Sequence, residues 1–190
     1  MELALYYIRL KQGDGLLKMW STLKNLKKFT PKAEVDRMIG MPIVPLEDRP
    51  AYYYGRGIVI YYSPTRFKVT GIQRVEYGDP GEYAVGLFHF STAAVLKTEL
   101  GLSSFEADDI APFNEDIAYG VISYRSTFRE IHQWAVKNTP EDYHEGITQR
   151  LVDGKMTFFR RFILYGPYEL YFYGRSKLTK VEGFQFVFPE

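Results

Sequence analysis

Cysteine is absent from the 190-residue chain. The protein therefore has no disulfide framework, no thiolate metal site and no cysteine nucleophile. Histidine is scarce as well: His89, His132 and His144 are too dispersed along the sequence to predict a zinc site. We expect no metal ion and no cofactor.

Long apolar runs and a strong net charge are also missing. No run reaches membrane-spanning length, and the N-terminus lacks the basic-then-apolar order of a signal peptide, so we expect a cytoplasmic protein with no membrane partner. The formal net charge of +1 excludes a uniformly basic coat. Six acidic residues and no basic one lie between Lys97 and Arg125, which leaves the rest of the chain basic and predicts a local positive face.

Hydrophobic periodicity predicts an α+β chain. Strands are predicted at residues 3–10, 36–46, 83–90 and 118–124, and helices at 16–29 and 93–100. A Tyr-rich pair of strands, 52–63 and 67–78, forms a hairpin that we treat as an insertion spanning 47–83. Without it, the element order is the βαββαβ order of a ferredoxin-like domain. The sequence thus predicts such a domain over residues 1–124.

Residues 125–190 are predicted to form a helix-plus-β-hairpin domain. A helix at 126–138 and a helical region from 140 to about 150 precede an aromatic tail, residues 156–190, in which eleven residues are Phe or Tyr. Alternation predicts two tail strands, 157–164 and 168–173, joined at Gly166-Pro167. Aromatic rings beside Arg and Lys suit stacking on bases with neutralisation of phosphates. A hairpin with an aromatic core and solvated charges is the alternative.

The helix at 126–138 offers a second nucleic-acid feature. Its polar side chains, with the residue before it, are Arg125, Arg129, His132, Gln133 and Lys137. Arg and Gln read base edges and Lys holds phosphate, so this helix suits a nucleic-acid groove. An ordinary amphipathic surface helix explains the same pattern. His89-Phe90-Ser91 would fit half of a two-histidine phosphoesterase, but the sequence has no second half.

Both ends of the chain carry motifs of one family. The opening contains Ile8-Arg9-Leu10 and Asp36-Arg37-Met38-Ile39-Gly40, and the tail contains Phe159-Arg160-Arg161-Phe162-Ile163 and Tyr173-Gly174-Arg175-Ser176-Lys177, followed by Gly183-Phe184. In order and spacing, these motifs resemble the CRISPR repeat-processing endoribonucleases of the type I-F, or Csy, class. The resemblance covers about 45 residues at the start and 65 at the end.

The resemblance implies that the basic helix enters the major groove of a repeat RNA hairpin, with Phe159 stacked on the hairpin base. The residues expected to contact RNA are Arg125, Arg129, His132, Gln133, Lys137, Phe159, Arg160, Arg161, Arg175, Ser176 and Lys177. Cleavage in the family needs no metal and gives a 2′,3′-cyclic phosphate, and the product hairpin stays bound in an effector complex. Other subunits of such a complex are therefore expected partners.

The expected catalytic residues match the family only in part. Tyr173 is retained beside the scissile nucleotide, but the family's catalytic His falls where this chain has Lys27, and its Ser falls in Leu151-Val152-Asp153. Lysine is a poor general base at neutral pH, although it can stabilise a pentavalent phosphorane. The sequence therefore leaves three interpretations open: a metal-independent endoribonuclease, an inactive hairpin-binding subunit, and a viral or mobile-element assembly protein.

Overall fold

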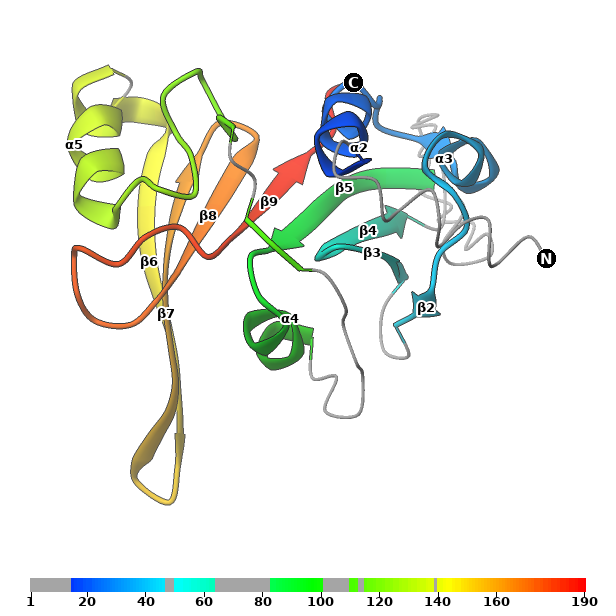
Figure 1. Ribbon diagram of the computed structural model, residues 1–190. Coiled ribbons are helices and arrows are strands. Elements are labelled where there is room, and N and C mark those ends of the chain that lie inside the picture. Colours follow the sequence, from blue (N-terminus) through cyan, green and yellow to red (C-terminus); the bar gives the residue numbers. More distant parts are fainter. Residues whose placement is uncertain (1–14, 47–49, 64–82, 101–109, 113–114, 139) are drawn as a thin grey trace, which may run out of the picture. The chain divides into compact units, whose positions relative to one another are not determined.

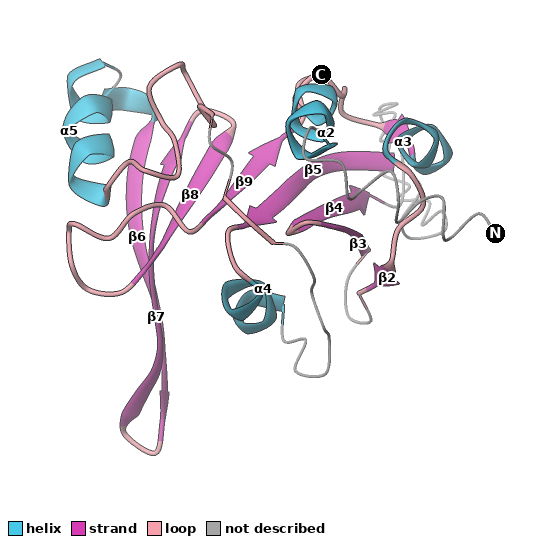
Figure 2. Cartoon of the chain, in the orientation of Figure 1, coloured by secondary structure: helices cyan, strands magenta, loops and turns pink. Residues whose placement is uncertain are grey.

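The computed structural model describes residues 15–46, 50–63, 83–100, 110–112, 115–138 and 140–190 (Figure 1). The chain is α+β, as predicted, and antiparallel sheet makes up most of its regular structure (Figure 2). It divides into unit 1, Met1–Phe88 with Val187–Glu190, and unit 2, His89–Phe186. The predicted domain boundary at residue 124 stays a prediction. Within the described ranges, no helix is long and apolar enough to cross a membrane.

Unit 1 places its helices and short strands around one antiparallel sheet. Its elements are α2 (Gly15–Leu23), β1 (Thr30–Pro31), α3 (Lys32–Ile39), β2 (Val44–Pro45), β3 (Ala51–Gly55), β4 (Ile58–Ser63) and β5 (Tyr83–Phe90), the last of which crosses into unit 2 at His89. The strand order is β2-β3-β4-β5, and β1 pairs with β5. Buried Leu23, Val35, Tyr54, Ile58 and Ile60 belong to its core.

The strand predicted at residues 36–46 is wrong over most of its length, because helix α3 occupies residues 32–39 and only Val44–Pro45, β2, is a strand. The acidic residue of the Asp36–Gly40 motif explains the difference. Lys32 Nζ contacts Asp36 Oδ2 at 2.6 Å across one helical turn, and the Tyr54 hydroxyl donates to Asp36 Oδ1 at 2.7 Å. The first contact favours helical spacing and the second ties α3 to β3, whereas alternation alone suggested a strand. Helix α2 is also shorter than predicted, since it ends at Leu23.

The predicted strand over 52–63 is two strands, β3 and β4, paired as a hairpin. Gly55, Arg56 and Gly57 all have positive φ, at 94°, 52° and 84°. Glycine adopts such angles without steric cost, so the turn forms in the middle of the Tyr-rich run. The predicted partner strand at 67–78 and the predicted first strand at 3–10 lie outside the described residues.

Unit 2 consists of antiparallel strands and of helices from two sequence regions. Its elements are α4 (Ala93–Leu100), α5 (Phe128–Asn138), the 3₁₀ helix η1 (Pro140–Asp142), β6 (Tyr143–Val152), β7 (Lys155–Tyr165), β8 (Tyr168–Tyr173) and β9 (Gly183–Val187), which leaves the unit at Val187. The order is β9-β8-β7-β6. Strands β6 and β7 continue beyond α5 as a long two-stranded hairpin (Figure 1).

Four predicted elements of unit 2 are confirmed and two are wrong. Helices α4 and α5 and the β7–β8 hairpin lie where the sequence predicted them, and Thr92 caps α4 by accepting from Val95 N at 3.2 Å. The strand predicted at 118–124 is a tight turn with one isolated bridge, between Ala118 and Ile122. The helix predicted from 140 to about 150 is η1 followed by β6, because pairing with β7 overrides the local helix-start signal.

Candidate functional site

The start of α5 and the end of the aromatic tail run side by side. Phe128 N donates to Thr179 O at 2.9 Å, and Arg129 N donates to Lys177 O at 2.9 Å. These bonds bring together four basic residues from two distant segments, Arg125, Arg129, Lys177 and Lys180, which we call the basic cluster. All four side chains are exposed, and none forms an ion pair within the described ranges. Such a cluster attracts an anion from solution.

Helix α5 itself begins with a capping box. Thr127 N donates to Glu130 Oε2 at 2.8 Å, and Glu130 N donates to Thr127 Oγ1 at 3.3 Å. The two bonds satisfy donors that an uncapped helix end would leave free. They also hold the pKa of Glu130 below its ordinary value, chiefly through the bond from the Thr127 amide.

The predicted nucleic-acid side chains of α5 lie on its exposed face. Phe128, Ile131 and Ala135 are buried. The four predicted residues, Arg129, His132, Gln133 and Lys137, are exposed, as are Glu130, Val136 and Asn138. His132 is partly engaged, since its Nδ1 contacts both the Tyr143 hydroxyl, at 2.8 Å, and the Glu145 carboxylate on β6. The imidazole is thus fixed against the sheet, and the other three side chains remain on the surface.

Arg161 has a structural position. It is 7% exposed, its guanidinium lies 4.1 Å from the centre of the Phe128 ring, and one Nη donates to Ser176 O. A side chain held this way does not present its charge on the surface. Arg161 joins β7 to α5 and to the segment that carries Lys177. It therefore helps to hold the two segments of the basic cluster together.

Phe159 and Arg175 meet near the middle of β7. The Arg175 guanidinium lies 5.7 Å from the centre of the Phe159 ring, and one Nη lies 3.3 Å from Met156 Sδ. Phe159 is half-buried and Arg175 is exposed. An aromatic ring beside a guanidinium is a suitable stacking surface for a base.

Tyr173 and Arg160 meet at Glu99, which belongs to α4. The Tyr173 hydroxyl donates to Glu99 Oε1 at 2.6 Å, and Arg160 Nη1 lies 2.9 Å from Glu99 Oε2. Burial, followed by the charge of Glu99, raises the pKa of Tyr173 well above its ordinary value. The phenol is therefore protonated at neutral pH and acts as a hydrogen-bond donor, not as a base.

The predicted tail residues do not all share one face of the sheet. Side chains alternate along β7, and Arg161 packs against α5 while Arg160 contacts Glu99 of α4. Phe159 therefore lies on the α5 face, as Arg161 does. Tyr173 pairs with Arg160 in the ladder and shares its face. The expected stacking residue and the expected catalytic tyrosine are thus on opposite faces of the sheet.

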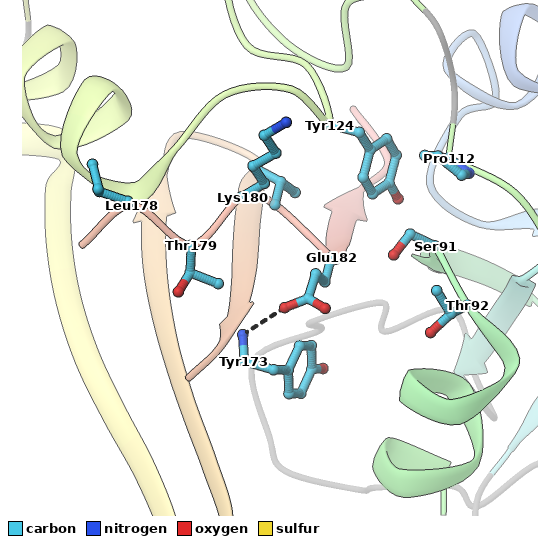
Figure 3. A pocket seen from close by; sticks show the side chains of 10 residues that line it. Ser91, Thr92, Pro112, Tyr124, Tyr173, Leu178, Thr179, Lys180 and Glu182 are labelled. Atoms are coloured by element: carbon cyan, nitrogen blue, oxygen red, sulfur yellow. Dashed lines mark hydrogen bonds between the residues drawn. The ribbon is translucent and has the colours of Figure 1, made fainter. Parts of the chain in front are cut away.

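A cavity of about 560 Å³ lies on the side of Tyr173 (Figure 3). It is lined by Ser91, Thr92, Pro112, Tyr124, Tyr173, Leu178, Thr179, Lys180, Val181 and Glu182. Glu182 Oε2 accepts from Tyr173 N at 3.1 Å, and burial raises the pKa of that carboxyl. Figure 3 shows the Ser91 and Thr92 hydroxyls directed toward the space that Glu182 faces.

Sequence reasoning missed most of this cavity. Its polar residues come from two short segments, 91–92 and 179–182, that carry no recognised motif. The sequence predicts Tyr173 as a catalytic residue, and it singles out Ser91 only within His89-Phe90-Ser91, for a different chemistry. His89 is buried with its Nδ1 against the Tyr124 hydroxyl, so it is a core residue here.

Lys27, the other expected catalytic residue, belongs to unit 1. Its side chain is exposed, and its carbonyl accepts from Thr30 N at 3.1 Å and Thr30 Oγ1 at 2.7 Å. Thus Lys27 and Tyr173 are described in separate units. Over the same described ranges, no cluster of three or more acidic or histidine side chains could hold a metal ion.

No protein-family model, curated protein or solved structure matches the chain.

Proposed function

We propose that the protein binds an RNA hairpin through unit 2 and cleaves it at its base without metal, remaining bound to the product. The basic cluster is the observation that carries this proposal. Backbone hydrogen bonds assemble it from residues about fifty positions apart, and its four charges are unpaired within the described residues. Exposed, unpaired cations next to a polar helix face suit a phosphate backbone.

The exposed face of α5 extends the proposed contact surface. Arg129 and Gln133 are one helical turn apart and both exposed, which suits them to reach base edges in a groove, while Lys137 lies one turn further on for phosphate. Phe159 shares this face of the sheet, so stacking on the hairpin base and groove contacts can be made together. The resemblance to the type I-F class supports the same arrangement.

The cleavage part of the proposal assigns different tasks to Lys27 and Tyr173. Tyr173, whose hydroxyl proton is donated to Glu99, would accept a hydrogen bond near the scissile nucleotide. Lys27 would stabilise negative charge on the phosphorane. Repeat RNA incubated in EDTA should be cut at one position, and Tyr173→Phe and Lys27→Ala should each slow the cut. Tight binding without any cut would favour the inactive hairpin-binding subunit.

The binding test uses a charge-matched pair of variants. Arg129→Ala/Lys177→Ala should weaken binding to the hairpin and lower the slope of log K against log salt by about 2, since each phosphate contact contributes about 0.9. Lys24→Ala/Arg37→Ala removes the same charge from exposed positions of unit 1. If both pairs weaken binding equally, the effect is one of net charge and the basic cluster is not the binding site.

One observation favours the assembly alternative. β6 ends the strand order of unit 2 and carries three exposed apolar side chains, Ile147, Leu151 and Val152. An exposed strand edge with apolar side chains can pair with another chain. Size-exclusion chromatography at micromolar concentration, beside a hairpin gel shift, separates the two functions: self-association without RNA binding would select assembly.

The proposal also covers the fold of residues 1–124 and the location of the protein in the cell. A ferredoxin-like arrangement for residues 1–124 is supported by helices α2 and α4, which follow the first and third predicted strands. Against it, helix α3 occupies the first part of the predicted second strand, and the predicted last strand is not at 118–124. The resemblance further implies a cytoplasmic protein that associates with other subunits of a CRISPR effector complex.

A further inference from the structure

Ser91 is a polar residue without a protein partner inside the cavity. It is 7% exposed, and within the described ranges its hydroxyl forms no hydrogen bond. A hydroxyl that lines a cavity and has no protein partner is available to donate to a ligand. Its amide, in contrast, donates to Glu182 O at 2.9 Å, which fixes the residue in place.

The side of the cavity next to Ser91 favours negative charge. Thr92 is the N-cap of α4, and because its Oγ1 accepts from Val95 N, its hydroxyl proton is free to be donated to a ligand. The N-terminal end of an α-helix carries partial positive charge. Lys180 lines the same cavity and is exposed, so its ammonium can reach the rim. Two hydroxyl donors and a cation suit a phosphate group.

Glu182 gives the cavity one acceptor with a defined direction. Its Oε2 is occupied by Tyr173 N, whereas no hydrogen bond to Oε1 is formed by the described residues. A carboxylate oxygen beside a phosphate site selects a ligand that carries a hydroxyl or amino donor next to its phosphate. The neighbouring ammonium of Lys180 opposes a metal cation in this position.

We propose that this cavity binds one unpaired ribonucleotide that flanks the RNA hairpin, with its phosphate against Ser91, Thr92 and Lys180 and its 2′-hydroxyl donating to Glu182. The volume of about 560 Å³ lies within the range of small-ligand pockets, roughly 300–1,000 Å³. Tyr124 and Tyr173 add aromatic surface for the sugar or base. The inference rests on the proposed hairpin binding and adds to it a site for a single-stranded nucleotide.

The experiment compares the affinities of a blunt hairpin and of the same hairpin with one unpaired nucleotide on its 3′ or 5′ side. The last paired nucleotide is 2′-deoxy in every RNA, and a denaturing gel checks that each RNA stays intact. One extension should tighten binding about tenfold, the effect of one or two hydrogen bonds to charged groups. A 2′-deoxyribose in the added nucleotide should remove most of that gain.

Two variants assign the gain to the cavity. Ser91→Ala and Glu182→Gln should each reduce the gain to about twofold or less while leaving the affinity for the blunt hairpin unchanged. Glu115→Gln, an exposed acid of unit 2 outside the cavity, should keep the full gain. Equal affinities for the blunt and extended hairpins would overturn the cavity proposal and leave hairpin binding intact. Absence of binding to either RNA would overturn both.

Discussion

Arg160 on β7 and Glu99 on α4 form an ion pair with 2.9 Å between Nη1 and Oε2, and their side chains are only 18% and 13% exposed. The guanidinium also lies 4.7 Å from the centre of the Tyr171 ring. Because Glu99 accepts from Tyr173 through its other oxygen, one carboxylate contacts both an expected RNA-binding residue, Arg160, and the expected catalytic Tyr173. Arg160 is therefore neutralised within unit 2.

Removing Glu99 should destabilise the fold more than removing an exposed acid. Glu99→Ala leaves the Arg160 charge without its partner in a largely buried place, so we expect a loss of about 3 kcal/mol in the free energy of unfolding. Urea denaturation measures it. Glu34→Ala, at an exposed position of α3, should change stability by less than about 0.5 kcal/mol. Equal losses of unfolding free energy in Glu99→Ala and Glu34→Ala would contradict a stabilising role for the ion pair.

Because of the capping box of α5, the stability of the folded protein should depend on pH in the acid range. The pKa of Glu130 is lowered in the folded protein. The ionised carboxylate therefore adds to the free energy of unfolding in full above the ordinary pKa of 4.5, and this stabilisation is lost as the pH falls through the lower folded pKa. The melting temperature of the parent should therefore fall below that pH, and the fall should be smaller in Glu130→Gln. Thr127→Ala should cost about 1 kcal/mol at neutral pH.

Phe158 and Phe159 provide a matched pair for the stacking hypothesis. They are adjacent in β7, so their rings lie on opposite faces, and Phe158 packs against Tyr173 with ring centres 5.9 Å apart. Phe159→Ala should weaken hairpin binding about tenfold or more, since stacking on a base contributes roughly 1–3 kcal/mol. Phe158→Ala should leave the affinity within about twofold. The reverse order would place the RNA on the other face.

Gly146 on β6 is the ladder partner of Phe162 on β7, and a methyl group at Gly146 would overlap the Phe162 ring. Gly146→Ala should cost about 1–3 kcal/mol of folding free energy, as overpacking does. The cost should be smaller when Phe162 is changed to Leu. A double-mutant cycle from urea denaturation tests this coupling, and additive effects would show that the ring is not the cause.

The sequence predicted elements whose signals are local. The β7–β8 hairpin follows from alternation interrupted by Gly166-Pro167, and α5 follows from its buried spacing of Phe128, Ile131 and Ala135. β6 was missed because its pairing partner, not its own composition, makes it a strand. Residues 143–152 are exposed or half-exposed and have no clear alternating pattern.

The site was predictable only where it coincides with such local patterns. The exposed polar residues of α5 could be named from helical spacing. The role of Arg161 could not, because its burial depends on Phe128 and Ser176 from other segments. Glu99 and the cavity residues Ser91 and Glu182 have no spacing signal, since their neighbours come together only in the folded unit.

The register shift in the β6–β7 ladder bears on how this hairpin can change in length. Arg150 pairs with Phe158 and Leu151 with Met156, so Thr157 between them has no ladder partner. A bulge of this kind absorbs a one-residue difference between two paired strands. Single-residue insertions or deletions in residues 151–156 should therefore be tolerated, because Phe158 to Arg161 keep their pairing with β6 and β8 and hence their faces.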